Sequence, residues 1–223
     1  VSKVIEAVKP DAVIHCAAYT AVDAAEDNAE LCRKVNAEGT QNIANMCKTL
    51  DIPMIYISTD YVFDGTGERP WEPDDERNPL NVYGQTKYEG ELAVQNTLEK
   101  YFIVRIAWVF GVNGKNFVKT MLNLTATKPQ LKVVFDQVGT PTYALDLANT
   151  ISTIIDDYKH SCNLNPEPKV DGHRESQTCT YAKSGIYHFS NEGVCRWYDF
   201  TKKIAEIAGN KVCDIQPCHS NEF

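Results

Sequence analysis

The sequence lacks two features that would point to a membrane or nucleic-acid partner. It has no run of apolar residues approaching the roughly 20 that a membrane-spanning helix needs. It also has no excess of positive charge, since 22 Lys and Arg residues stand against 30 Asp and Glu, for a net charge of −8. Proteins that bind nucleic acid or anionic membranes usually carry a basic patch. We therefore expect neither a nucleic-acid nor a membrane partner.

Glycine is missing from the start of the chain, where the first one is Gly39. A dinucleotide-binding fold needs a glycine-rich turn after its first strand, so that backbone amides can approach a pyrophosphate at a helix N-terminus. No such turn occurs in this sequence. If the chain binds a dinucleotide, the pyrophosphate loop has to come from residues upstream of Val1.

Cysteine is plentiful, but its spacing does not form a recognisable framework. The eight cysteines are scattered, and several lie in apolar contexts where a free thiol behaves as a small hydrophobe. Such usage indicates a reducing compartment, and we expect the cytoplasm. Cys213, Cys218 and His219 suggest a metal site, but the spacing lacks the second paired half of a zinc motif. No metal is therefore predicted.

The composition is that of an ordinary globular protein. The chain has 223 residues, of which 43% are hydrophobic and 23% charged. This length suffices for one large domain or two small ones.

The most informative stretch runs from Met54 to Lys87. An apolar, β-branched run ends in two hydroxyl residues, Ser58 and Thr59, which is typical of a buried parallel strand whose carboxyl end opens onto a site. After a polar, proline-rich bridge come Tyr83 and Lys87, four residues apart and so on one face of a predicted helix. A hydroxyl, a tyrosine and a lysine in this arrangement can polarise and protonate a carbonyl group.

A tyrosine followed four residues later by a lysine is weak evidence by itself. The chain contains a second such pair, Tyr198 and Lys202, inside an amphipathic helical pattern, and we interpret it as a chance match. Alone, either pair would be typical of a half-exposed helix face. The strand with Ser58 and Thr59 upstream is what favours Tyr83.

Hydrophobic periodicity predicts alternating helices and strands along the chain. The predicted helices cover residues 1–8, 26–50, 83–98, 116–124, 144–158 and 197–208, and the predicted strands cover 12–18, 54–58, 102–107, 131–135 and 186–189. His15 is expected to be a core histidine. Residues 159–183 are polar and show no periodicity, which indicates a variable surface insertion. The alternation predicts an α/β fold with a parallel sheet.

Several ordered motifs give the sequence a strong family resemblance. The chain resembles the extended short-chain dehydrogenase/reductases and, more narrowly, the dTDP-4-dehydrorhamnose reductases. The resemblance covers nearly the whole chain except residues 158–183, and its motifs are Ser58 to Gly65, Tyr83 to Lys87, Ala17 to Asp23, Arg105 to Gly111, Asn116 with Phe117, Gly139 to Thr142 with Asp146 to Ala148, and Gly185 to His188.

The resemblance implies a fold and a division of the chain. The expected fold is a Rossmann-type doubly wound parallel sheet with a small α/β substrate-binding lobe. Against the family pattern, the first βαβ unit with its glycine loop is missing, and we expect truncation at both ends. The implied cofactor-binding domain comprises 1–110 with returning segments 139–158 and 184–190, the substrate lobe 111–138 and 191–223, and the insertion 159–183.

The implied reaction is reduction of the 4-keto group of dTDP-4-dehydro-L-rhamnose by NADPH or NADH. Tyr83 would donate a proton, and Lys87 would lower the pKa of Tyr83, ordinarily about 10, and bind the cofactor ribose. Thr59 would stabilise the carbonyl oxygen as charge develops, with Ser58 as the alternative hydroxyl. The implied cofactor contacts are Ala18, Tyr19, Thr20, Ile57, Tyr83 and Lys87, and the implied substrate contacts are Thr59, Asp60 and Trp108.

Other interpretations stay open at this point. Ala18 also suits tight helix–sheet packing, and Trp108 also suits a structural role. Dehydrating relatives carry Asp-Glu after the threonine, whereas Tyr61 follows Asp60 here, which favours plain reduction over an epimerase or dehydratase. A non-catalytic relative such as the regulatory subunit of methionine adenosyltransferase is the alternative from another class. A homodimer is a further open expectation.

Overall fold

The computed structural model describes residues 1–67, 69–164 and 183–222, in two compact units. Unit 1 comprises Val1–Arg105 and Thr150–His188, and unit 2 comprises Ile106–Asn149 and Phe189–Phe223. Most of the predicted insertion, residues 165–182, lies outside the described residues. The assignment of one unit to cofactor and the other to substrate stays a prediction.

Unit 1 is built around a four-stranded sheet with the order β1-β2-β3-β8. Its strands are β1 (Val13–His15), β2 (Met54–Thr59), β3 (Tyr101–Ile106) and β8 (Gly185–Phe189). Strands β1 and β2 are parallel, with His15 opposite Tyr56. Their carboxyl ends therefore meet at one edge of the sheet, as the sequence predicts.

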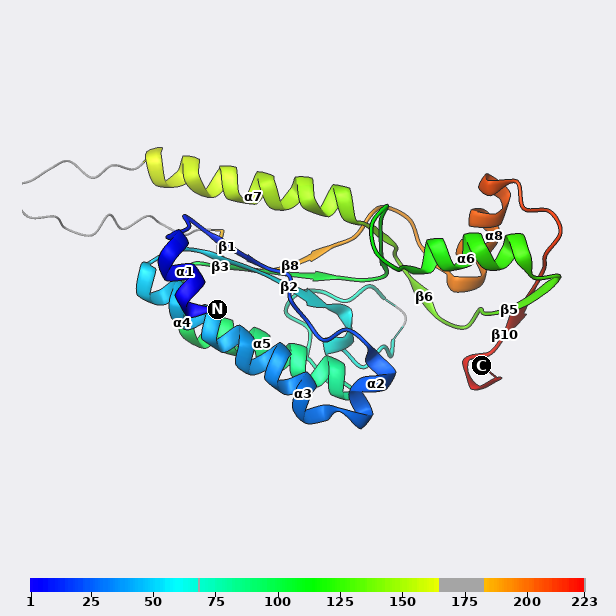
Figure 1. Cartoon of the computed structure of the whole chain (residues 1–223), viewed down its shortest axis with the longest axis horizontal. Coiled ribbons are helices and arrows are strands. Elements are labelled where there is room, and N and C mark those ends of the chain that lie inside the picture. The colour runs from blue at the N-terminus through cyan, green and yellow to red at the C-terminus, as the bar shows by residue number, and fades with distance from the viewer. Residues whose placement is uncertain (68, 165–182, 223) are drawn as a thin grey trace, which may run out of the picture. The chain divides into compact units, whose positions relative to one another are not determined.

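Helices cover both faces of this sheet (Figure 1). Helix α7 (Ala144–Leu164) lies on one face, while α1 (Ser2–Val8), α4 (Gly39–Leu50) and α5 (Val82–Thr97) lie on the other. The buried core between the sheet and these last helices is apolar, and its members include Ile43, Cys47, Met54, Tyr56, Val94 and Ile103. The predicted α/β fold is confirmed.

The long helical region predicted for residues 26–50 is divided in the structure. Helices α2 (Val22–Asp27) and α3 (Ala29–Arg33) are followed by a π-helical turn, η1 (Lys34–Glu38), and then by α4. A π-helical turn within a helix is rare and often marks a functional position. Periodicity alone predicted a single helix, because one extra residue in a turn barely changes the apolar pattern.

Unit 2 combines two helices with short strand pairs. Helices α6 (Phe117–Thr127) and α8 (Trp197–Ala208) pack with the parallel pair β5 (Gln130–Val134) and β10 (Asp214–Cys218). The pairs β4 (Val109–Phe110) with β7 (Thr142–Tyr143), and β6 (Val138–Gly139) with β9 (Cys195–Arg196), complete it. Of these strands, periodicity predicted only β5. The two-residue strands carry no periodic signal, and β10 contains Pro217, a residue that argues against a strand.

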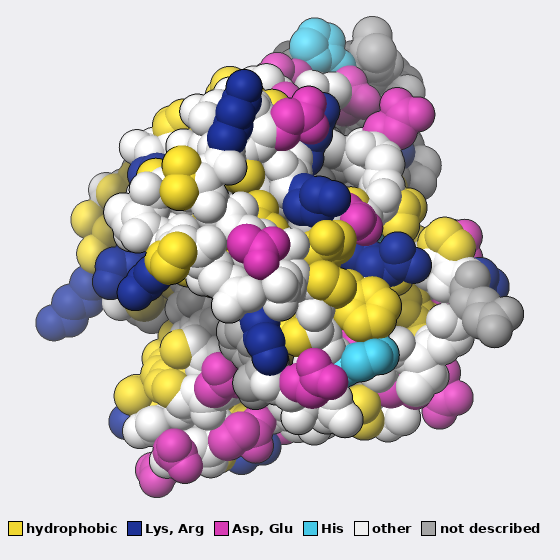
Figure 2. All heavy atoms as spheres, turned by 90° about the vertical axis from the view of Figure 1, so that its right-hand side faces the viewer, with side chains coloured by type: hydrophobic (Ala, Val, Ile, Leu, Met, Phe, Trp, Pro, Cys, Tyr) yellow, Lys and Arg dark blue, Asp and Glu magenta, His cyan; other side chains and the backbone are white. Residues whose placement is uncertain are grey.

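The surface carries both signs of charge. On the face shown in Figure 2, acidic and basic side chains are interspersed with apolar ones. Within the described part of the chain, no helix combines the length and the apolar character required to cross a membrane.

Candidate active site

Helix α5 begins at the carboxyl end of β2 and presents the Tyr83 and Lys87 pair. The side chain of Asn81 caps it by accepting a hydrogen bond from the backbone N–H of Gly84 at 2.7 Å. Gly84 itself lies against the strand end, where a Cβ atom would come within 2.1 Å of the carbonyl oxygen of Tyr61. Only glycine lets the first turn of α5 approach the strand end this closely.

Tyr83 lies partly buried beside the hydroxyl at the end of β2. Its ring meets the ring of Tyr61 edge to face, with 5.6 Å between centroids. Burial raises the pKa of Tyr83 to about 12, against a smaller opposing effect of hydrogen bonding with Thr59. Removal from water dominates this pKa, and the lowering of it by Lys87 stays a prediction. Tyr83 keeps its proton at neutral pH.

Lys87 is a buried lysine, with only 2% of its surface exposed. Its Nζ donates a hydrogen bond to the carbonyl oxygen of Ile57 at 2.7 Å and lies 4.1 Å from the centre of the Tyr56 ring. Burial lowers the pKa of Lys87 to about 7, and the nearby Glu91 carboxylate opposes that effect. An ammonium has two further N–H donors, so Lys87 can bind another hydroxyl or carbonyl group.

The two hydroxyls at the end of β2 have different partners. Ser58 donates a hydrogen bond of 2.6 Å to the buried carboxylate of Glu91. Thr59 instead donates to Asp60 at 3.2 Å and accepts from the backbone N–H of Tyr61 at 3.2 Å. Ser58 is bonded to a carboxylate that is itself ion-paired, whereas Thr59 lies within hydrogen-bonding range of Tyr83, so the geometry favours Thr59 as the hydroxyl beside Tyr83.

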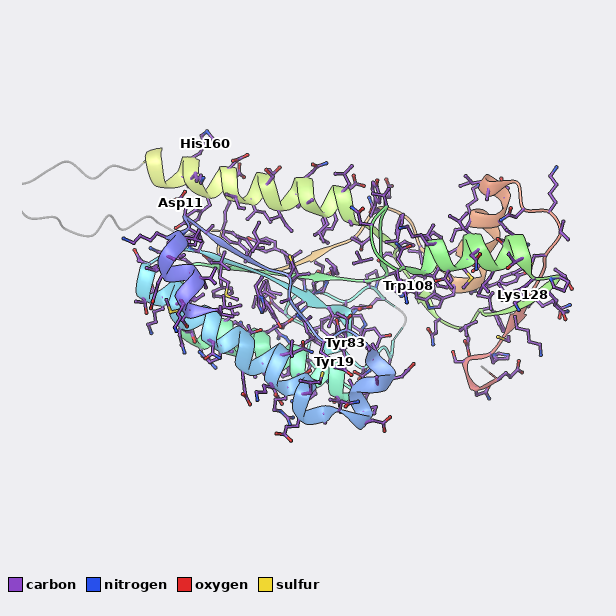
Figure 3. All side chains as sticks on the ribbon, in the orientation of Figure 1. Asp11, Tyr19, Tyr83, Trp108, Lys128 and His160 are labelled. Atoms are coloured by element: carbon purple, nitrogen blue, oxygen red, sulfur yellow. The ribbon has the colours of Figure 1, made fainter. Side chains whose placement is uncertain are left out.

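The segment after β1 is held by a residue whose side-chain role the sequence argument missed. Asn36, in the π-helical turn, accepts a hydrogen bond from the backbone N–H of Tyr19 at 2.7 Å and donates to the backbone oxygen of Tyr19 at 3.1 Å. Asn36 also donates to the hydroxyl of Thr86 on α5 at 3.1 Å. It thereby ties this segment to α5, and Figure 3 shows Tyr19 and Tyr83 at the same end of unit 1.

The predicted cofactor contacts lie at this edge of the sheet. Ala18 and Tyr19 are partly buried and Thr20 is exposed, all in the loop after β1. Ile57, on β2, supplies the backbone oxygen that binds Lys87. His15, predicted to be structural, is buried, with Nε2 at 2.9 Å from the hydroxyl of Thr40. The structure therefore brings the predicted residues of unit 1 together at one edge.

Trp108 belongs to unit 2 and has an unusual backbone. Its φ of 49° lies in the left-handed region, where a non-glycine residue is strained. The indole stacks on Trp197 with centroids 3.4 Å apart, and it covers Gly139, where a Cβ atom would come within 2.6 Å of the ring. Strain at such a residue is often found at a ligand site.

The candidate metal ligands at the end of the chain are not grouped together. Cys218 is buried, Cys213 is partly exposed, and His219 faces the carboxylate of Asp136 at 3.3 Å. Among residues 1–67, 69–164 and 183–222, no three His, Cys, Asp or Glu side chains are placed to share a metal ion.

The parallel sheet covered on both faces, with loops gathered at its carboxyl edge, is the architecture of a Rossmann-type α/β protein. Comparison with known families agrees with this class, and the RmlD substrate binding domain family matches residues 1–223. The chain belongs to this family.

Individual relatives carry the name that the sequence motifs suggested. The chain is 40% identical over 213 residues to dTDP-4-dehydrorhamnose reductase of Mycolicibacterium smegmatis, covering 95% of this chain and 58% of the relative. It is 37% identical to the enzyme of that name from Escherichia coli, covering 93% and 63%. The chain thus spans about 60% of the length of these curated relatives. The predicted resemblance is confirmed.

Solved structures give the same result for the fold. A dTDP-4-dehydrorhamnose reductase from Clostridium acetobutylicum superposes with a TM-score of 0.86 at 41% identity, covering 100% of this chain and 70% of that one. The dTDP-4-dehydrorhamnose reductase from Bacillus anthracis, which was solved in complex with NADP, is 37% identical to this chain. It superposes with a TM-score of 0.86 and again covers 100% of this chain and 70% of that one.

Proposed function

We propose that the protein reduces the 4-keto group of dTDP-4-dehydro-L-rhamnose to give dTDP-L-rhamnose, with NADPH or NADH as reductant. The observation that carries this proposal is the cluster of Thr59, Tyr83 and Lys87 at the carboxyl edge of the sheet. The names of the relatives support the same reaction, since the matches to these relatives cover most of this chain. The NADP-bound relative supports the choice of cofactor class.

The residues present fit the nicotinamide end of such a cofactor. Lys87 has N–H donors beyond its bond to Ile57, which suits it to hold ribose hydroxyl groups. The loop of Ala18, Tyr19 and Thr20 lies at the same edge, and its small residues let a flat ring approach the backbone. A reduced nicotinamide at this position would supply the hydride.

The mechanism then depends on proton control by the chain itself. Hydride addition to the ketone carbon places negative charge on its oxygen, and the hydroxyl of Thr59 would hydrogen-bond that oxygen. Tyr83, which holds its proton because burial raises its pKa to about 12, would donate that proton to the same oxygen. The new alcohol carries the hydride on carbon and the Tyr83 proton on oxygen. Protonated Lys87 would stabilise the tyrosinate left behind.

Asp60 and Trp108 are the proposed contacts to the sugar nucleotide. Burial raises the pKa of Asp60, although Thr59 donates a hydrogen bond to its carboxylate. Trp108 is a partly exposed aromatic side chain whose position is fixed by its stack on Trp197. The cytoplasmic location and the homodimer remain predictions.

The test is NADPH consumption with dTDP-4-dehydro-L-rhamnose, using the protein as encoded by its gene. Tyr83→Phe removes one oxygen and the proton that it carries, so we expect kcat to fall by at least about 100-fold. NADPH binding should remain, because the ring of Tyr83 is retained.

The second tyrosine–lysine pair offers a matched control. In Tyr198→Phe the same atom is lost from a tyrosine that is likewise followed four residues later by a lysine, and the Nζ atom of Lys202 lies 5.3 Å from the centre of the Tyr198 ring. We expect kcat within about twofold of wild type. Absence of turnover in a wild-type protein that binds NADPH would contradict the proposal and would favour a non-catalytic regulatory relative.

A further inference from the structure

A buried ion pair lies directly behind the candidate active site. Glu91 on α5 is fully buried and Arg105 on β3 is 2% exposed. Arg105 binds the carboxylate through two hydrogen bonds, from Nε at 2.9 Å and from Nη2 at 2.7 Å. A buried pair of this kind is costly to desolvate, so stability alone is a weak reason for its presence.

The same two residues connect most elements of the site. Glu91 accepts the hydrogen bond from Ser58, the residue next to Thr59. The remaining nitrogen of Arg105 donates to the carbonyl oxygen of Pro73 at 3.1 Å and lies 3.3 Å from Nε2 of His188 on β8. The pair therefore links the end of β2, helix α5, strands β3 and β8, and the loop around Pro73.

Glu91 also lies on the same face of α5 as the proposed catalytic residues. It follows Lys87 by four residues and Tyr83 by eight, so the three side chains are stacked along one side of the helix. We propose that Glu91 is a positioning residue: through Ser58 and Arg105 it holds Thr59 against the Tyr83 and Lys87 face of α5, and its carboxylate, one helical turn from Lys87, favours the charged form of that lysine. This inference rests on the proposed function for its catalytic meaning.

The charge on Lys87 depends on the groups that surround it from each neighbouring element. Burial has the largest effect and disfavours the charged form of Lys87. Among the surrounding groups, Glu91 favours that charged form most. The titratable groups that face Lys87 are Glu91 on α5, Tyr56 on β2, His15 and Cys16 on and after β1, and Cys32 on α3.

The first test reads the charge on Lys87 without substrate or cofactor. The protein is labelled with ¹³C at the lysine Cε atoms, and the Lys87 signal is assigned by its loss in Lys87→Arg. In Glu91→Gln we expect the proton affinity of Lys87 to fall about tenfold, because the nearest carboxylate is gone. An unchanged Lys87 titration in the folded variant would overturn the proposal.

A matched control lies two residues away on the same helix. Glu89 forms an ion pair with Arg33 at 2.8 Å, but both side chains are partly exposed. Glu89→Gln should leave the Lys87 titration and kcat within about twofold of wild type. An equal effect of Glu89→Gln and Glu91→Gln would show a general loss of charge and would contradict a specific role for Glu91.

Glu91→Gln leaves the Arg105 charge buried and can prevent folding. The double variant Glu91→Met with Arg105→Met replaces the pair by apolar side chains, a change that buried ion pairs often tolerate. The Lys87 proton affinity should fall in this variant as well, and an unchanged value would count against the proposal.

Steady-state kinetics distinguish a residue that positions Thr59 from one that only stabilises the fold. Ser58→Ala keeps the ion pair and removes only the hydrogen bond beside Thr59, so kcat should fall about fivefold with KM within about twofold. Wild-type kcat in Ser58→Ala would overturn the positioning role. If the wild-type protein shows no turnover, the proposed function fails, while the Lys87 titration still decides the effect of Glu91.

Discussion

At the scale of single residues, Lys87 combines a stability cost with a proposed functional role. The unfolded chain binds a proton at this lysine with a pKa near 10.5, whereas burial lowers the folded pKa to about 7. The unfolded state therefore binds more protons between about pH 7 and 10.5, and stability rises with pH across that window. At neutral pH the lysine destabilises the fold.

Replacing this lysine should stabilise the protein and abolish its activity. For Lys87→Met we expect the free energy of unfolding at pH 7 to rise by about 1–2 kcal/mol, less than the full linkage effect because the bond to Ile57 is lost. The gain should shrink toward pH 10.5, and kcat should fall at least about 100-fold. Urea unfolding at several pH values measures the first effect.

The exposed Lys202 of the second tyrosine–lysine pair is the control for this change. Lys202→Met should change the free energy of unfolding by less than about 0.5 kcal/mol. Destabilisation of Lys87→Met at every pH would mean that the bond to Ile57 outweighs the cost of burial.

Among the proposed site residues, the sequence points to those whose relation to one another is local. Tyr83 and Lys87 are one helical turn apart, and Thr59 ends a recognisable strand, so pattern and spacing suffice. The pairing of Glu91 with Arg105 depends on two elements meeting in space, which no local pattern encodes. One signal was present: Glu91 lies on the same helix face as Tyr83 and Lys87 and so had to be buried there.

At the scale of elements, the start of helix α5 sets the position of Tyr83. Asn81 caps the helix, Tyr83 lies in the first turn, and Gly84 permits contact with the strand end. Periodicity predicted this helix within one residue at each end, from 83–98 against the observed Val82–Thr97. The side-chain cap and a glycine of close approach depend on tertiary contacts, which periodicity does not report.

Loss of this cap should affect both stability and rate. Asn81→Ala removes the acceptor for the Gly84 N–H, and we expect a loss of about 1 kcal/mol in the free energy of unfolding. Because Tyr83 lies in the same turn, kcat should also fall about threefold to tenfold. Thermal unfolding and steady-state kinetics measure the two effects.

Helix α6, in unit 2, offers the same kind of cap on a helix that carries none of the proposed catalytic residues. Asn116 accepts a hydrogen bond from the backbone N–H of Lys119 at 3.1 Å. Asn116→Ala should cost a similar free energy, with kcat within about twofold of wild type. If Asn81→Ala folds fully and keeps wild-type kcat, the first turn of α5 does not control Tyr83.

At the scale of the whole molecule, alternation of helices and strands was enough to predict the fold class. The order of the strands and the division into two units depend on contacts between distant segments. The predicted end of the helix at residue 158 was too early, since α7 continues to Leu164. Polar residues from 159 onward hid this continuation, because an exposed helix turn needs no apolar stripe.

The chain contains only part of the length of its curated relatives. Its sequence matches the family from residue 1 to 223 and spans 58% to 63% of three curated relatives. The residues proposed to act on the carbonyl group are present in this span. Those expected to hold the pyrophosphate are absent from the sequence, since the first glycine is Gly39.

The most direct test of the account follows the hydride itself. The protein as encoded by its gene is incubated with dTDP-4-dehydro-L-rhamnose and NADPH carrying deuterium at both C4 positions, and the sugar product is analysed by mass spectrometry and NMR. The account predicts one deuterium on C4 of the sugar for every cofactor oxidised. A sugar product without deuterium, formed while the cofactor stays reduced, would contradict a reductase.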